Sequence, residues 1–325
     1  MITPDDMQKY SKLIEDQIKF LKVLEFNNQE VIWHYTSGDA LLDIVETGTL
    51  YATQVSCLND STEIRYGEKL LRDAFMNIRT DVMEEKLLLE RIIKTSVEES
   101  AAQTNLGSAW FVTCFSKEKD DLSQWRAYSG GENGYAIAFL ASGFFGRGSF
   151  VTRVNYEKEQ HNQVAENVAN ATMSFFKEGL TGRVSGRPPT SAPGLLAADD
   201  TAVEREAWTI EFLGVWERLI GRLAPMVKDA AFRAENEYRI VHELQVHEMG
   251  QLRFRQKQTL MSRHLPLIFP PPNYATQSQL LPIMEVMVGP SRHKEISRVS
   301  VETFLRQKGY PAVPVTMSNI PFQLT

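Results

Sequence analysis

The stretch Val31-Ile32-Trp33-His34-Tyr35-Thr36 determines how this chain is organised, and Ser37-Gly38-Asp39 follows it directly. Its β-branched and aromatic residues surround one histidine, a composition typical of a buried strand. Serine is a common helix N-cap, so we expect the strand to lead straight into a helix. Sites are often built at such strand ends. His34, Tyr35 and Thr36 are therefore candidates for binding a small polar ligand, with a purely structural role as the alternative.

The composition indicates a globular protein that is not basic overall. The 325 residues are 43% hydrophobic, enough for one large core or two modest ones. A net charge of −6 argues against a surface that binds nucleic acid by charge over a whole face, although a local basic patch remains open. Cys57 and Cys114 are too few for a disulfide framework or a cysteine-built zinc site. A reducing cytoplasm fits this cysteine content best.

The N-terminal residues predict a helix and no targeting signal. They carry no basic-then-apolar signal, and no apolar run approaches the ~20 residues needed to span a bilayer, so we expect a cytoplasmic protein without membrane contact. Thr3-Pro4-Asp5-Asp6 has the form of a helix start. We expect residues 1–30 to form an N-terminal helix that packs on the rest or pairs with a second copy in a homodimer. Residues 31–325 are expected to form a single domain.

Two further segments of that domain are predicted to be a turn and a loop. Leu58-Asn59-Asp60-Ser61-Thr62-Glu63 is a polar turn before a helix, so Asn59 and Asp60 are either helix caps or residues at the rim of a site. Residues 182–198 are rich in glycine, proline and serine and are predicted to be a loop insertion within the domain.

A second stretch with chemical potential is Glu235-Asn236-Glu237-Tyr238-Arg239-Ile240-Val241. Its alternation predicts a strand with Glu235, Glu237 and Arg239 on one face. One interpretation is a solvated edge strand whose ion pair contributes under ~1 kcal/mol. The other is a carboxylate site on a strand flanked by core residues.

One basic cluster follows, formed by Arg253-Phe254-Arg255-Gln256-Lys257 with Arg263 and His264. Phe254 lies between two arginines, so the cluster could contact phosphates. A solvated strand face is the alternative.

Several short motifs occur in a fixed order along the chain and together resemble a known family. They are His34-Tyr35-Thr36, Leu58-Asn59-Asp60 with Glu63, Cys114-Phe115-Ser116, Trp125 with Tyr128, Gly134 to Phe139, Glu235 to Ile240, and Val288-Gly289-Pro290. From roughly Val31 to Ser318, the chain resembles the bacterial domain-of-unknown-function family 2971. That pattern is in turn similar, more distantly, to the ADP-ribosyltransferase fold.

The resemblance implies a fold class and two central residues. The expected fold is α+β, with an ADP-ribosyltransferase-like pair of small packed sheets that form a cleft surrounded by helices. His34 matches the histidine on the first core strand of that fold. Glu237 matches the glutamate on a late strand, and Glu235 completes a Glu-x-Glu spacing. Tyr51, Tyr128 and Tyr135 compete for the aromatic position.

The function implied by the resemblance is NAD-dependent ADP-ribosyl transfer, or NAD hydrolysis, by a toxin or phage-defence enzyme. Glu237 would stabilise an oxocarbenium-like state and His34 would contact the substrate, so both must face one cleft. The residues expected to bind NAD are Tyr35, Thr36, Asn59, Asp60, Trp125, Tyr128, Glu235 and Arg239. No metal is expected. The acceptor would be a protein, a nucleic acid or water, and an antitoxin or other regulatory partner is expected to restrain the activity.

Two alternatives stay open. Asp60, Glu63, Glu235 and Glu237 could converge on a divalent metal and cut a phosphodiester, although no lysine beside Glu237 supports that chemistry. In the second alternative the same cleft binds a nucleotide without catalysis and reports it to a partner protein.

Overall fold

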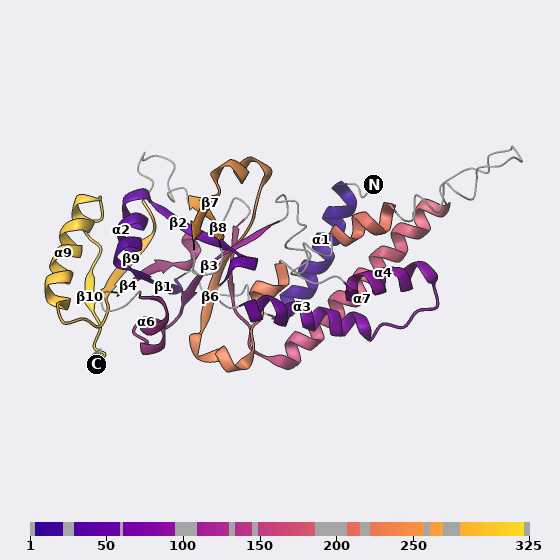
Figure 1. Cartoon of the computed structure of the whole chain (residues 1–325), viewed down its shortest axis with the longest axis horizontal. Helices are drawn as coiled ribbons and strands as arrows, with labels where there is room; N and C mark the ends of the chain where they lie inside the picture. Colours follow the sequence, from indigo (N-terminus) through magenta and orange to yellow (C-terminus); the bar gives the residue numbers. More distant parts are fainter. Residues whose placement is uncertain are drawn as a thin grey trace, which may run out of the picture. The chain divides into compact units, whose positions relative to one another are not determined.

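A computed structural model gives the fold of the chain (Figure 1). It describes residues 4–21, 29–58, 61–94, 109–129, 134–144, 149–185, 207–214, 222–256, 261–268 and 280–321. The chain forms two compact units. The helical unit comprises residues 1–22, 60–109 and 155–230, and the sheet unit comprises residues 23–59, 110–154 and 231–325. Each unit combines segments distant in sequence, and the division into residues 1–30 and 31–325 stays a prediction.

The helical unit is built around one long helix. Its elements are α1 (Pro4–Ile18), η1 (Lys19–Leu21), α3 (Ser61–Met76), α4 (Met83–Lys94), α7 (Lys158–Ser185), a helical stretch at 207–214 and η5 (Ala224–Met226). Helices α1 and α3 both pack on α7, and α4 packs on α3 (Figure 1). Residues 77–82, which include Arg79, Thr80 and Asp81, separate α3 from α4.

Helix α1 buries its apolar stripe within this unit. Tyr10, Ile14, Ile18 and Leu21 are all buried, because α1 lies against α7. The Tyr10 hydroxyl is 2.9 Å from the Thr172 hydroxyl of α7. Packing inside one chain thus accounts for the stripe, and the homodimer stays a prediction.

The first residues of the predicted loop insertion are helical. Helix α7 continues to Ser185, so residues 182–185 are not part of a loop. Residues 186–206, which hold the rest of the 182–198 stretch, lie outside the described residues. Beyond them Trp208 and Phe212 are buried and in ring contact.

The sheet unit contains ten strands in one connected sheet. They are β1 (Val31–Ser37), β2 (Thr49–Gln54), β3 (Trp110–Ser116), β4 (Gly134–Leu140), β5 (Ser149–Arg153), β6 (Glu237–Glu243), β7 (Arg253–Gln256), β8 (Met261–Ile268), β9 (Ile283–Val288) and β10 (Val315–Met317). The connecting elements are α2 (Gly38–Thr47), η2 (Val55–Cys57), α6 (Leu122–Tyr128), η4 (Ala141–Phe144), η6 (Ala230–Glu235), η7 (Val246–Gln251) and α9 (Lys294–Gln307).

The sheet branches at β3. On one side β3 pairs along its whole length with β6, which pairs with β5. On its other side β3 pairs with β2 at Phe111 and Val112 and with β1 at Ser116. One arm then runs β1-β4-β9-β10 and the other runs β2-β8-β7. The α+β class is confirmed. In place of the expected pair of small packed sheets, hydrogen bonds along β3 join all ten strands into one connected sheet.

The opening strand and helix form as the sequence predicts. The Ser37 side chain accepts a hydrogen bond from the Ala40 N–H at 3.3 Å and caps α2. Gly48 ends α2 at a φ of 62°, a conformation that costs glycine little. Strand β10, which follows Pro314, lies at a sheet edge, where a proline is tolerated. No helix among the described residues combines the length and apolarity needed to cross a membrane.

Candidate functional site

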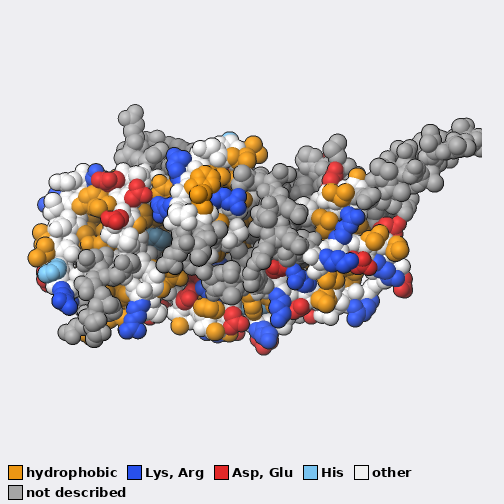
Figure 2. Space-filling view, viewed as in Figure 1, with side chains coloured by type: hydrophobic (Ala, Val, Ile, Leu, Met, Phe, Trp, Pro, Cys, Tyr) orange, Lys and Arg blue, Asp and Glu red, His pale blue; other side chains and the backbone are white. Residues whose placement is uncertain are grey.

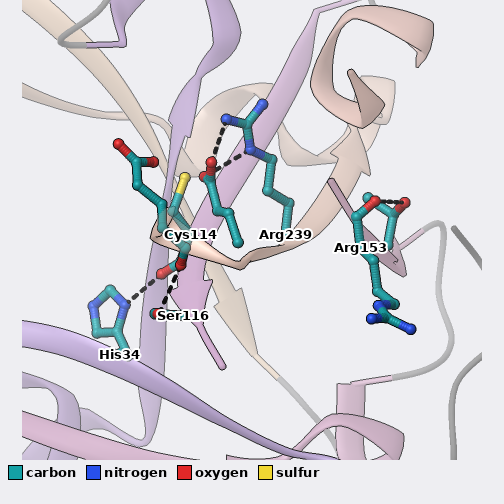
Figure 3. A network of polar contacts seen from close by, with 8 residues as sticks. His34, Cys114, Ser116, Arg153 and Arg239 are labelled. Carbon is teal, nitrogen blue, oxygen red and sulfur yellow. Dashed lines mark hydrogen bonds and ion pairs between the residues drawn. The ribbon is translucent and has the colours of Figure 1, made fainter. Parts of the chain in front are cut away.

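His34 lies at the branch of the sheet. Because β3 pairs with β2 at one end and with β1 at the other, Cys114 falls between the two partners. The His34 ring fills this interval, and its Nδ1 lies 2.9 Å from the Cys114 carbonyl oxygen (Figure 3). A carbonyl only accepts, so Nδ1 carries the proton and donates. The His34 side chain therefore supplies the Cys114 carbonyl with a hydrogen bond of the kind that a neighbouring strand supplies in a regular sheet.

Burial determines the charge of His34. It lowers the pKa of the imidazole from the ordinary 6.5, and the hydrogen bond to Cys114 opposes this shift. With Nδ1 protonated in a neutral ring, Nε2 is a hydrogen-bond acceptor. Among the described residues no hydrogen bond to Nε2 is recorded, so this nitrogen is available to a ligand hydroxyl or amide.

Tyr35 and Thr36 are part of the core. The Tyr35 hydroxyl donates to the Glu118 carbonyl at 2.7 Å and accepts from the Asp121 N–H at 3.2 Å. Burial raises the pKa of this phenol, which stays protonated. Thr36 is buried opposite Tyr135 of β4. The Tyr35 hydroxyl thus connects β1 to the residues at the start of α6, and the NAD-binding roles of Tyr35 and Thr36 stay predictions.

The two aromatic residues of α6 differ in exposure. Trp125 is buried, its ring meets Tyr35 edge-on at 4.7 Å, and its Nε1 donates to the Asp120 carboxylate at 2.8 Å. Tyr128, at the end of the same helix, is 44% exposed. Of the two residues expected to bind NAD, only Tyr128 presents ring surface to solvent.

Glu237 forms a buried ion pair with Arg239. Both contacts of the bidentate pair measure 2.8 Å, from Nε to Oε1 and from Nη2 to Oε2. Glu237 is 7% exposed and Arg239 is 1% exposed. Strand β6 lies between β3 and β5, so the interpretation as a solvated edge strand is wrong. Figure 3 shows Arg239 in this pair, separate from the His34 contact.

Glu235 does not share a strand face with Glu237, contrary to expectation. Asn236 has a φ of 44°, so the extended alternation starts only at Glu237, and Glu235 ends the preceding 3-10 turn. The carbonyl of Glu235 accepts a hydrogen bond from the Ser116 hydroxyl at 2.8 Å. This backbone contact connects Glu235 to the sheet.

The pairing register separates His34 from Glu237. Glu237 lies opposite Ser116 on β3, and Ser116 lies opposite Trp33 on β1, so these three side chains share one face. His34 follows Trp33 and therefore points to the other face. Its ring contacts that of Phe115, the neighbour of Ser116, at 5.4 Å between centroids. The expectation that His34 and Glu237 face one cleft is thus corrected, while their individual roles stay predictions.

Three of the predicted site residues have no side chain in the described part of the structure. Asn59 and Asp60 lie outside the described residues, as does the side chain of Glu63. Asp60 and Glu63 belong to the helical unit, whereas Glu235 and Glu237 belong to the sheet unit. Within the described ranges no group of three or more histidine, cysteine, aspartate or glutamate side chains is placed to hold a metal ion.

One polar group beside Tyr35 and Trp125 was not predicted. Lys119 lies 5.3 Å from the ring centroid of Trp33 and forms an ion pair with Glu285 of β9 at 2.7 Å. Trp33, Ala138 and Glu285 are aligned across β1, β4 and β9, which brings these distant residues together. No sequence motif marks the pair, because cross-strand alignment depends on strand order.

The fold defines a mixed α+β protein with a branched ten-stranded sheet. Residues 124–240 match the sequence model of a family described as "Protein of unknown function (DUF2971)", and this match confirms the family resemblance over those residues. It includes Trp125, Tyr128, Glu235, Glu237 and Arg239, whereas His34 and Asn59 precede it. No curated protein matches the chain. Comparison with solved structures likewise gives no match.

Proposed function

We propose that this protein cleaves the nicotinamide–ribose bond of NAD and transfers ADP-ribose to an acceptor or to water, as a toxin or phage-defence enzyme would. The observation that carries the proposal is the state of His34: a neutral ring fixed through Nδ1, with Nε2 presented as an acceptor. Such a nitrogen suits a ribose hydroxyl. The resemblance of the ordered motifs to the ADP-ribosyltransferase fold supplies the reaction class.

In the proposed reaction nicotinamide leaves with the electron pair of the broken bond, and the ribose carbon becomes oxocarbenium-like. A fixed carboxylate stabilises that positive charge. Glu237 is the carboxylate that the resemblance indicates, and Arg239 holds both of its oxygens in place. The register places Glu237 and His34 on opposite faces of the sheet, so they are alternative centres for this reaction and each has its own test.

The test incubates the purified full chain with NAD, with and without magnesium, in the presence of cell lysate, RNA or DNA. Free nicotinamide and added mass are measured. We expect His34→Ala to lower nicotinamide release by about 100-fold, the usual effect of losing a transition-state hydrogen bond. His293→Ala, which changes an exposed histidine of the same unit, is the matched control and should leave release unchanged.

The same assay separates the alternatives. Release that survives Glu237→Ala would remove that residue from the mechanism and leave the reaction class intact. Magnesium-dependent cutting of RNA or DNA without nicotinamide release would favour the nuclease. NAD binding without any turnover would favour the sensor.

A further inference from the structure

The hairpin of β7 and β8 exposes an aromatic ring among arginines. All four residues of β7 are exposed, and β7 is an edge strand of the sheet. Phe254 is 61% exposed, and Met261 of β8 is 60% exposed. In Figure 2 hydrophobic and basic atoms lie together over this hairpin. Phe254 and Met261 therefore leave apolar surface next to basic side chains on an exposed edge of the sheet, and this combination points to an interaction surface.

The register sorts these side chains onto two faces. Phe254 lies directly opposite Arg263, and both point to one face of the hairpin. Arg253 and Arg255 point to the other face, where the Arg255 guanidinium lies 4.8 Å from the ring centroid of Tyr51. A chain that binds along this exposed edge can therefore meet arginines on both faces and an aromatic ring on one.

Among the described residues, the arginines of the hairpin have no carboxylate partner. Within the described part of the chain no ion pair joins Arg253, Arg255 or Arg263 to an aspartate or glutamate, although the protein carries a net charge of −6. Three cations on one short hairpin thus produce a local positive potential on an acidic protein. The partner that complements them carries regularly spaced negative charges.

We propose that the β7–β8 hairpin binds single-stranded nucleic acid, with a base stacked on Phe254 and backbone phosphates contacted by Arg253, Arg255 and Arg263. Stacking on an exposed aromatic ring beside phosphate-binding arginines is the usual way proteins hold single strands. A duplex buries its base faces and offers no such stacking. β7 is only four residues long, which disfavours strand addition by a peptide.

Binding needs no NAD, so the proposal stands apart from NAD cleavage. Only a further step, in which the bound strand accepts ADP-ribose, rests on the proposed function. Failure to bind and failure to release nicotinamide are therefore separate results.

Fluorescence anisotropy of the full chain, without NAD, provides the test. The probes are fluorescein-labelled RNA and DNA single strands about 16 nucleotides long and the matching duplex. We expect the single strands to bind more tightly than the duplex, with an affinity that falls as salt rises. Phe254→Ala should weaken binding about 10-fold, and Phe254→Tyr should retain it. Arg253→Gln with Arg263→Gln should reduce the slope of log affinity against log salt by about 1.4.

Matched controls lie on α9 of the same unit. Ile296→Ala removes an equally exposed apolar side chain, and Arg306→Gln removes an exposed arginine, so both should bind as the parent does. Absent binding at low salt, tighter binding of the duplex, or equal effects of hairpin and control variants would each overturn the proposal. Self-association in the ultracentrifuge that Phe254→Asp abolishes, without nucleic-acid binding, would assign the hairpin to protein contact instead.

Discussion

His34 and Glu237 lie on the two strands that flank the C-terminal end of β3, yet their polar atoms are used differently. One ring nitrogen of His34 is bound to the backbone at the branch, and the other has no recorded partner among the described residues. Both carboxylate oxygens of Glu237 are bound by Arg239. A polar atom without a protein partner can accept a hydrogen bond from a ligand directly. The buried Glu237–Arg239 pair would first have to lose its own hydrogen bonds. The difference makes His34 the stronger ligand-binding candidate.

Removing Arg239 tests the Glu237 half of this comparison and should have the largest effect. Arg239→Met leaves a buried carboxylate without its cation and should lower the free energy of unfolding by about 3–5 kcal/mol, measured by urea denaturation. Adding Glu237→Leu removes that charge and should recover part of the loss. Arg298→Met, at a partly exposed pair on α9, should cost less than about 1 kcal/mol. Equal losses of stability in the Arg239 and Arg298 variants would show that the buried pair stabilises the fold no more than a partly exposed pair does.

Replacing His34 tests whether its side chain stabilises the sheet where the sheet branches at β3. His34→Phe keeps a ring beside Phe115 but leaves the Cys114 carbonyl without its donor, so the free energy of unfolding should fall by about 1–3 kcal/mol. Thermal unfolding followed by circular dichroism measures the change. An unchanged melting temperature would mean that water replaces the imidazole, and that the branch does not need this side chain.

The pH dependence of stability sharpens the comparison, since the ordinary pKa of the His34 imidazole is near neutrality. Its pKa in the folded protein is lowered by burial, so the unfolded chain binds more protons below the ordinary value of 6.5. The contribution is therefore complete above that pH and is lost as pH falls through the lowered pKa. Melting temperatures measured at descending pH should fall less in His34→Phe than in the parent. Parallel pH profiles would contradict the assignment of a neutral His34.

Replacing Tyr35 should have the smallest effect on stability. Its hydroxyl, like the carboxylate of Glu237, is already hydrogen-bonded within the protein. Tyr35→Phe removes contacts to the Glu118 carbonyl and the Asp121 N–H and should cost about 1 kcal/mol in chemical denaturation. NAD turnover, if present, should be unaffected. Loss of turnover with unchanged stability would instead show that the hydroxyl serves a ligand.

Local elements were largely predictable from the sequence. The strand 31–37, its Ser37 cap, Gly48 at the end of α2 and the strand containing Glu237 all form, because these features depend on neighbouring residues. Glu235 was placed wrongly because the left-handed Asn236 interrupts an alternation that looks continuous in the sequence. A single backbone angle of this kind leaves no periodic signal.

The arrangement of the site could not be predicted in the same way. Which face a side chain occupies depends on pairing register, and register on β3 is set by partners far away in sequence, from Trp33 to Glu237. The Lys119–Glu285 pair was missed for the same reason. Residue types and spacing carry no information on which strands become neighbours.

The sequence by itself determined the α+β class, the family resemblance and the local identity of the strand around His34, since composition, caps and alternation act over short distances. The tertiary structure decided that one branched sheet forms, that Glu237 is buried against Arg239, and that His34 occupies the branch on the other face. These outcomes depend on which strands share hydrogen bonds along β3. Non-local pairing of that kind is a property of the folded chain as a whole.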